Sequence, residues 1–213
     1  MLTLAFDCST STMSIALING SKILGEKNYI QEAKHSEMLV LEIKNLLDSN
    51  KINFNDLDLI IATNGPGSYT GIRVALAVLK IIKITTQKPV FTVNCCEVIA
   101  DKYSKNYNKI NVIIQANGDE VYYAKYNINN NFEELVSPRI SSVGDVLLEI
   151  KTEEFLCGSA NKIFKEHLLK SNQDDMILAY DVAIYGQKKF LQNKDSQDIL
   201  PLYLRDPKIT KRK

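Results

Sequence analysis

The chain has 213 residues, of which 45% are hydrophobic, and its formal net charge is +1. This composition suffices for a folded core in one compact domain or two small lobes, and the near-neutral charge excludes nucleic-acid binding through a global basic field. The chain has four cysteines, Cys8, Cys95, Cys96 and Cys157. Their spacing matches neither a disulfide framework nor a zinc site, so we expect a reducing, cytoplasmic location.

The N-terminal part of the chain has the pattern of three strands and a helix. Met1 leads directly into an apolar strand, so neither a signal peptide nor a membrane segment is expected. Asn19-Gly20 is a type I′ hairpin signal, which makes the second and third strands antiparallel. Apolar residues then recur at helical spacing. The predicted strands cover residues 2–6, 13–18 and 22–29, and the helix covers 36–50.

A glycine-rich turn between a strand and a helix dominates residues 58–84. Gly65, Gly67 and Gly71 allow a sharp turn or a close backbone approach. A P-loop would need a lysine after Gly71, and the dinucleotide fingerprint would need glycine at Thr70, so neither phosphate motif fits. The segment therefore predicts a tight strand-to-helix connection and gives little support to a phosphate site.

The helix predicted at 70–84 is apolar almost all round, with a narrow polar stripe of Arg73, Lys80 and Lys83. Such a helix is either buried in the centre of a core, or it covers a sheet with one face and meets a partner with the other. The pattern alone leaves both alternatives open.

The second half of the chain repeats the element order of the first. After a strand at 89–93 and a helix at 95–103, three strands are predicted, with a hairpin signal at Asn117-Gly118. Helices and strands then alternate. The predicted strands cover residues 110–115, 121–126, 132–137, 154–157 and 176–179, and the helices cover 142–150, 160–169 and 182–192. This duplicated order resembles the actin, sugar-kinase and Hsp70 superfamily, whose two similar lobes enclose a nucleotide cleft.

Several segments of the chain resemble the TsaB (YeaZ) family. They are L-A-F-D-C-S-T-S-T at 4–12, H-S-E-M-L at 35–39, N-G-P-G-S-Y-T-G-I-R at 64–73 and P-L-Y-L-R at 201–205. The resemblance implies an α/β, actin-like (ASKHA, ribonuclease H-like) two-lobed fold, with a mixed sheet and flanking helices in each lobe. The predicted division is an N-terminal lobe at 1–104, a C-terminal lobe at 105–207 and a basic tail at 208–213.

The same resemblance implies a non-catalytic, activating subunit of the bacterial complex that adds threonylcarbamoyl to adenosine beside the anticodon of tRNAs reading codons that start with A. Its expected partners are a TsaD-like catalytic paralogue and a TsaE-like ATPase. The chain is expected to form a homodimer when it is alone and to contact tRNA indirectly, through the complex. No membrane, cofactor or metal is expected. The excess apolar surface of the helices at 36–50 and 70–84 predicts the partner interface, made by Met38, Leu41, Ala75, Leu79 and Ile82. Glutamate at Ala75 is expected to abolish association and leave a folded monomer.

Catalytic chemistry is poorly supported by the residues. Asp7, Ser9 and Gly158 match a vestigial nucleotide site, but side chains stand where catalytic relatives have phosphate-binding glycines. The two histidines, His35 and His167, do not form a zinc motif, and no nucleophile has a recognisable base, which argues against a peptidase. The alternative function is an independent actin-like ATPase or small-molecule kinase that uses Asp7 and Asp119.

Overall fold

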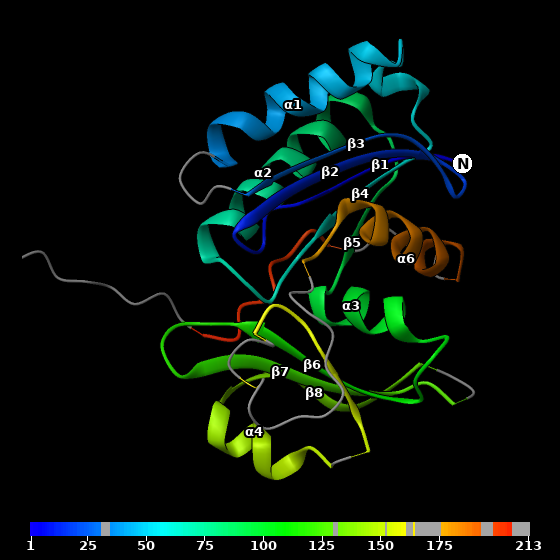
Figure 1. The fold of residues 1–213 in the computed structure, drawn as a ribbon. Coiled ribbons are helices and arrows are strands. Elements are labelled where there is room, and N and C mark those ends of the chain that lie inside the picture. The colour runs from blue at the N-terminus through cyan, green and yellow to red at the C-terminus, as the bar shows by residue number, and fades with distance from the viewer. Residues whose placement is uncertain are drawn as a thin grey trace, which may run out of the picture.

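The computed structural model describes residues 1–30, 35–129, 132–151, 153–160, 164, 176–192 and 198–205, without the side chains of 35–37. Two mixed sheets lie in a five-layer stack (Figure 1). Helices α1 and α2 form one outer layer, α3 and α6 lie between the sheets, and α4 covers the far side. This arrangement confirms the predicted actin-like α/β fold. No helix within the described ranges combines the length and apolarity needed to cross a membrane.

The first sheet has the order β3-β2-β1-β4-β5. Its strands are β1 (Leu2–Asp7), β2 (Thr12–Asn19), β3 (Lys22–Ile30), β4 (Leu59–Thr63) and β5 (Val90–Val93). The hairpin predicted at Asn19-Gly20 joins β2 and β3, with Gly20 at a φ of +62°. β1 pairs antiparallel with β2 and parallel with β4, so the C-terminal ends of β1 and β4 lie side by side.

One face of this sheet is covered by α1 (His35–Ser49) and α2 (Tyr69–Thr86), with the short 3-10 turn η1 (Phe54–Asp56) between α1 and β4. Both helices bury an apolar stripe in a core shared with Phe6 and Ile15. From α1 the stripe contains Leu39, Ile43, Leu46 and Leu47. Ser68 caps α2, because its hydroxyl accepts a hydrogen bond from the backbone N–H of Gly71.

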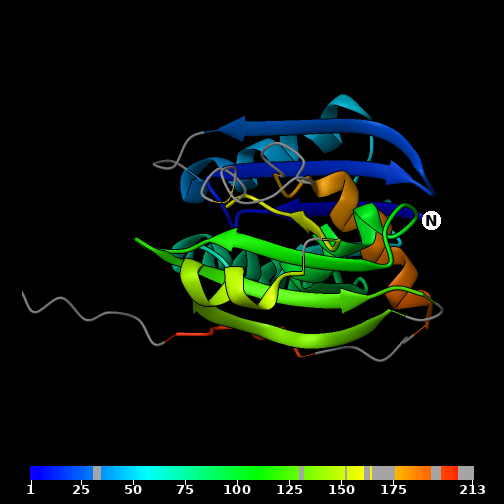
Figure 2. The same cartoon turned by 60° about the horizontal axis from the view of Figure 1, so that its bottom comes forward.

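The second sheet has the order β8-β7-β6-β9. Its strands are β6 (Lys109–Gln115), β7 (Glu120–Asn127), β8 (Glu133–Ser142) and β9 (Phe155–Cys157). Helix α4 (Val143–Glu149) lies across its outer face, as Figure 2 shows. The strand predicted at 176–179 is wrong, because Met176 to Leu178 pair with no strand and Ala179 already begins α6. The helix predicted at 160–169 and the tail at 208–213 lie largely or wholly outside the described residues.

The layer between the sheets consists of α3 (Cys95–Tyr103) and α6 (Ala179–Gln192). Helix α3 packs on the second sheet, whereas α6 packs on the first. Gly186 makes this approach possible, since a Cβ there would lie 2.6 Å from the Ile61 side chain. The α6 residue Gln187 donates a hydrogen bond of 2.7 Å to the Thr3 hydroxyl of β1.

The predicted division at residue 104 therefore needs correction, because α6 comes from the C-terminal half and completes the N-terminal lobe. One core cluster joins the two sheets through α3 and α6, and it includes Ile61 of β4, Val112 of β6 and Val182 of α6. An apolar helix face is compatible with either sheet, so periodicity alone gave no sign of this crossing.

Candidate functional site

The turn between β1 and β2 contains Asp7, the residue that matches the acidic group of a nucleotide site. Asp7 ends β1 and is fully buried. One carboxylate oxygen, Oδ1, accepts hydrogen bonds from the Ser9 backbone N–H at 3.2 Å, from the Ser9 hydroxyl at 2.6 Å and from the Thr63 hydroxyl at the end of β4. The other, Oδ2, has no hydrogen-bond partner within the described part of the chain. Burial raises the pKa of Asp7 to about 6, although the hydrogen bonds from Ser9 and Thr63 oppose this shift.

The glycine-rich loop packs directly on this turn. The Ser68 backbone N–H donates a hydrogen bond of 2.6 Å to the Ser9 carbonyl. A Cβ at Gly67 would lie 2.1 Å from that same carbonyl oxygen, and one at Gly71 would lie 1.8 Å from the carbonyl oxygen of Cys8. Any side chain at either glycine would therefore collide with backbone. Of the two alternatives that the sequence left open for these glycines, a sharp turn or a close backbone approach, the structure has the close approach at Gly67 and Gly71.

The thiols beside the turn are not poised as nucleophiles. Cys8 and Cys95 are fully buried, and burial raises the pKa of both thiols far above the ordinary value, with the Asp7 carboxylate adding to the shift. The Cys95 thiol lies 3.2 Å from the Ser9 hydroxyl. Among the described residues, no group of three His, Cys, Asp or Glu side chains is placed to hold a metal ion.

Gly158, the third residue assigned to the vestigial nucleotide site, follows β9 in the second sheet. A Cβ at Gly158 would lie 2.0 Å from the carbonyl oxygen of Ile113, so this glycine is required by packing on β6. The backbone that Gly158 approaches is that of β6 in the second sheet, whereas Asp7 ends β1 in the first. Asp119, the second carboxylate of the alternative kinase function, is exposed at the turn between β6 and β7.

The C-terminal segment 198–205 crosses the glycine-rich loop, a contact that the sequence did not predict. The Leu202 backbone N–H donates a hydrogen bond of 2.8 Å to the Asn64 carbonyl. The ring of Tyr203 stacks on Tyr69 with 4.7 Å between centroids. Arg205 forms an ion pair of 2.5 Å with Glu120 of β7. The segment thus ties the loop of the first sheet to the second sheet, and the only sequence signal for it was the P-L-Y-L-R motif.

The predicted partner interface divides into buried and accessible residues. Ala75 and Leu79 have no exposed surface and Ile82 is 6% exposed, because all three face the sheet and α1 in the chain's own core. They cannot form a docking surface while the chain is folded, which corrects the prediction for these three residues. The expectation that Ala75→Glu would leave a folded monomer is corrected for the same reason. Met38 is half-buried and Leu41 is exposed.

Other apolar side chains occupy the outer surface of the same two helices. Val40 and Leu41 on α1 and Ile81 and Ile84 on α2 are each more than half exposed. The helices contact each other in the outer layer of the molecule (Figure 1). We call these four residues the α1–α2 apolar surface. Leu41 was among the predicted interface residues, whereas Ile81 and Ile84 were not, because α2 is apolar in nearly every direction.

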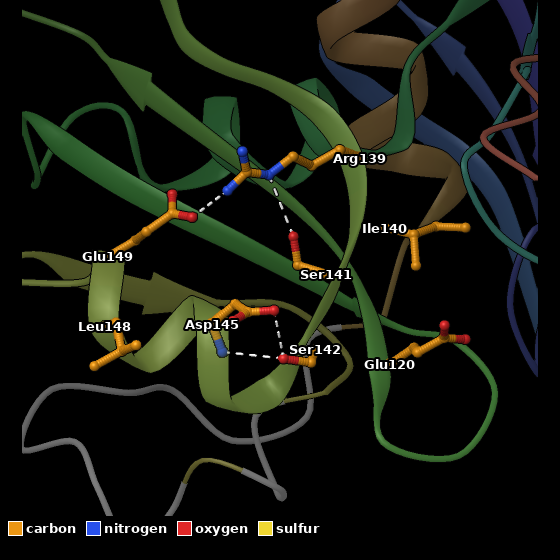
Figure 3. A pocket seen from close by; sticks show the side chains of 8 residues that line it. All are labelled: Glu120, Arg139, Ile140, Ser141, Ser142, Asp145, Leu148 and Glu149. Atoms are coloured by element: carbon orange, nitrogen blue, oxygen red, sulfur yellow. Dashed lines mark hydrogen bonds and ion pairs between the residues drawn. The ribbon is translucent and has the colours of Figure 1, made fainter.

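A separate open groove of about 630 Å³ lies in the second lobe between β8 and α4. Figure 3 shows that Arg139 forms an ion pair with Glu149 and that the Ser142 hydroxyl caps α4 by accepting from the Asp145 backbone N–H. Glu120, which also lines the groove, pairs with Arg205 outside it. None of the predicted site residues lines the groove.

Residues 22–206 match the model of a family described as TsaD: tRNA N6-adenosine threonylcarbamoyltransferase. A curated relative from Buchnera aphidicola subsp. Acyrthosiphon pisum, named tRNA threonylcarbamoyladenosine biosynthesis protein TsaB, is 27% identical over 94% of this chain and 87% of its own length. A TsaB protein from Bacillus subtilis is 29% identical over 65% of this chain and 60% of its own length.

Solved structures place the fold in the same group. YeaZ from Pseudomonas aeruginosa superimposes with a TM-score of 0.81 at 22% identity, over 95% of this chain and 99% of that protein. The activator of 2-hydroxyisocaproyl-CoA dehydratase from Clostridium difficile, solved with bound ADPNP, shares the fold more distantly, with a TM-score of 0.50 at 11% identity over 93% of this chain and 99% of that protein. The family model, the curated relatives and the four sequence motifs agree, and this chain belongs to the TsaB (YeaZ) branch of the family that the threonylcarbamoyltransferase model describes.

Proposed function

We propose that this chain is a non-catalytic subunit in the biosynthesis of tRNA threonylcarbamoyladenosine. In this proposal a TsaD-like paralogue transfers threonylcarbamoyl to the adenosine beside the anticodon of tRNAs that read codons starting with A, and a TsaE-like ATPase assists it. The curated relatives are named tRNA threonylcarbamoyladenosine biosynthesis proteins, and these names support a role for this chain in that process. Alone, the chain forms a homodimer through the surface that otherwise binds the paralogue.

The observation that carries the non-catalytic role is the packing of the glycine-rich loop on the β1–β2 turn. In catalytic members of the actin-like superfamily, this turn holds nucleotide phosphate on bare N–H groups. Here the loop meets the carbonyl oxygens of Cys8 and Ser9, and a Cβ at Gly67 or Gly71 would already be too close to them. Asp7 is buried beneath the turn with hydrogen bonds to Ser9 and Thr63. This packing supports a turn that closes on the chain's own backbone instead of on a nucleotide.

The α1–α2 apolar surface supports docking of a partner. Two adjacent helices expose isoleucine, leucine and valine side chains to water. A helix pair of a partner that packed on them would bury this apolar area, which is favourable. A buried, unpaired charge at such a contact is strongly unfavourable. We therefore assign partner binding to Val40, Leu41, Ile81 and Ile84, with the half-buried Met38 beside them.

The test is co-purification of the tagged chain with the TsaD-like paralogue from the same organism, followed by titration of the pair. Ile84→Glu is expected to weaken the complex at least about 30-fold, as loss of an interface hot spot does. Leu148→Glu is the matched control, because Leu148 is 87% exposed on α4 at the opposite side of the molecule. Equal affinities of the two variants would exclude the α1–α2 apolar surface as the docking site.

The alternative of an independent kinase or ATPase is tested on the isolated chain with ATP and magnesium. We expect no turnover above background and no saturable nucleotide binding. An ATPase activity that disappears in the Asp7→Asn variant, with the fold intact by circular dichroism, would refute the non-catalytic role.

A further inference from the structure

Two exposed aromatic rings gather at one place on the surface. The chain has ten tyrosines and seven phenylalanines, all in the described ranges. Tyr69 and Tyr203 are the two that are more than a third exposed, and they stack on each other with 28° between the ring planes. The Arg73 guanidinium lies 5.3 Å from the centroid of the Tyr69 ring and donates a hydrogen bond of 3.2 Å to its hydroxyl.

This group is held in place before any ligand binds. Tyr69 is the first residue of α2, whose N-terminus is capped by Ser68. Tyr203 follows Leu202, which is hydrogen-bonded to the loop at Asn64. A ring whose position is already fixed loses little conformational entropy when a planar group stacks on it.

The charges around the rings are positive. Across its 18 residues α2 carries three cations and no carboxylate. Glu120 of β7 forms an ion pair with Arg205 of the C-terminal segment, which offsets its negative charge. The net charge of +1 excludes a global basic field, so the positive charge at the rings is local and comes from Arg73.

We propose that Tyr69, Tyr203 and Arg73 bind single-stranded RNA directly. An unpaired base stacks on the exposed tyrosine rings and Arg73 contacts a neighbouring phosphate, which is how proteins commonly hold single strands. This inference rests on the proposed function only for the identity of the RNA, which is then the anticodon loop of the tRNA. The proposed function has this chain contact tRNA only through the complex, and the present inference adds a direct contact between this chain and the RNA.

The test measures fluorescence anisotropy of a labelled anticodon stem–loop RNA, titrated first with the isolated chain and then with its complex with the paralogue. Loss of one base–aromatic stack corresponds to about 5-fold to 150-fold in affinity. Tyr203→Ala is expected to lose at least about 10-fold, and Arg73→Gln is expected to reduce the salt dependence. Tyr203→Phe, which keeps the ring, is the matched control and retains wild-type affinity. A fully paired duplex of the same composition is expected to bind more weakly than the stem–loop.

Three results would overturn the inference. The first is an absence of RNA binding by the wild-type chain and its complex. The second is unchanged RNA affinity of a folded Tyr203→Ala variant. The third is a loss of affinity for the paralogue, measured without RNA, that matches the loss for RNA, because the rings would then be a protein contact. Ile84→Glu should lose the paralogue and keep the RNA affinity of the isolated chain, which separates failure of this inference from failure of the proposed function.

Discussion

Replacement of Asp7 by asparagine is expected to remove a specific pH dependence from the stability of the fold. The carboxyl is fully buried, and its pKa is raised from 3.8 to about 6 because burial disfavours the charged form. A carboxyl with a higher pKa in the folded state binds its proton more tightly there. Its contribution to stability is therefore greatest below pH 3.8 and is lost as the pH rises through about 6.

The magnitude follows from the size of that shift. A difference of about 2 pKa units corresponds to about 3 kcal/mol between the fully protonated and fully ionised limits. Between about pH 4.5 and about pH 7.5 the loss is about 2 kcal/mol. Asparagine keeps an oxygen that can accept from Ser9 and Thr63, but its NH₂ group replaces Oδ2, which lacks a partner among the described residues. The unsatisfied amide costs about 1–3 kcal/mol, so stability near neutral pH changes little while the pH dependence disappears.

The assay is urea unfolding of the wild-type chain and of Asp7→Asn across that pH range. The difference between the two unfolding free energies isolates Asp7 from every other titrating group. We expect this difference to change by about 2 kcal/mol in favour of asparagine as the pH rises. Parallel curves for the two proteins would show that Asp7 titrates normally, and the argument from its burial would then be wrong.

Three further substitutions test the packing. Ala75→Glu should prevent stable folding, because Ala75 has no exposed surface and the glutamate would place a charge in the core. Circular dichroism would show the loss of structure, and a native spectrum would contradict the burial of Ala75. Gly71→Ala should destabilise the fold by about 3 kcal/mol, because its Cβ would lie 1.8 Å from a carbonyl oxygen, and a wild-type melting temperature would refute this. Lys125→Met should cost about 3–5 kcal/mol in urea unfolding, because it leaves the 5%-exposed Glu154 carboxylate without its ion-pair partner at 2.7 Å; a loss below 1 kcal/mol, on the order of a surface pair, would refute it.

The order of strands and helices in the first half could be predicted because its signals are local. The hairpin at Asn19-Gly20 and the strand–glycine–helix unit around Gly65 depend on neighbours in the chain, and both are present in the structure. The strand at 176–179 failed for the opposite reason. Ile177 is buried between elements distant in sequence, and a short apolar run does not distinguish such a position from a strand.

The partner surface could be assigned to two helices but not to their side chains. On α2, Leu79 and Ile81 are both strongly apolar, and only the position of the sheet decides that Leu79 is buried and Ile81 exposed. The close approach of Gly71 to Cys8 and the stacking of Tyr203 on Tyr69 join residues far apart in sequence. The sequence shows a glycine and a tyrosine at these positions, but it does not show which residues they contact.

The return of α6 to the first sheet sets the order in which the molecule can be completed during translation. Strands β1, β2 and β4 are synthesised early, but the apolar face that α6 covers stays open until residues 179–192 have left the ribosome. A nascent chain ending near residue 104 would carry that face uncovered and would be a target for chaperones. The two halves of this protein therefore mature together, and a break in the gene between them would not yield two self-sufficient modules.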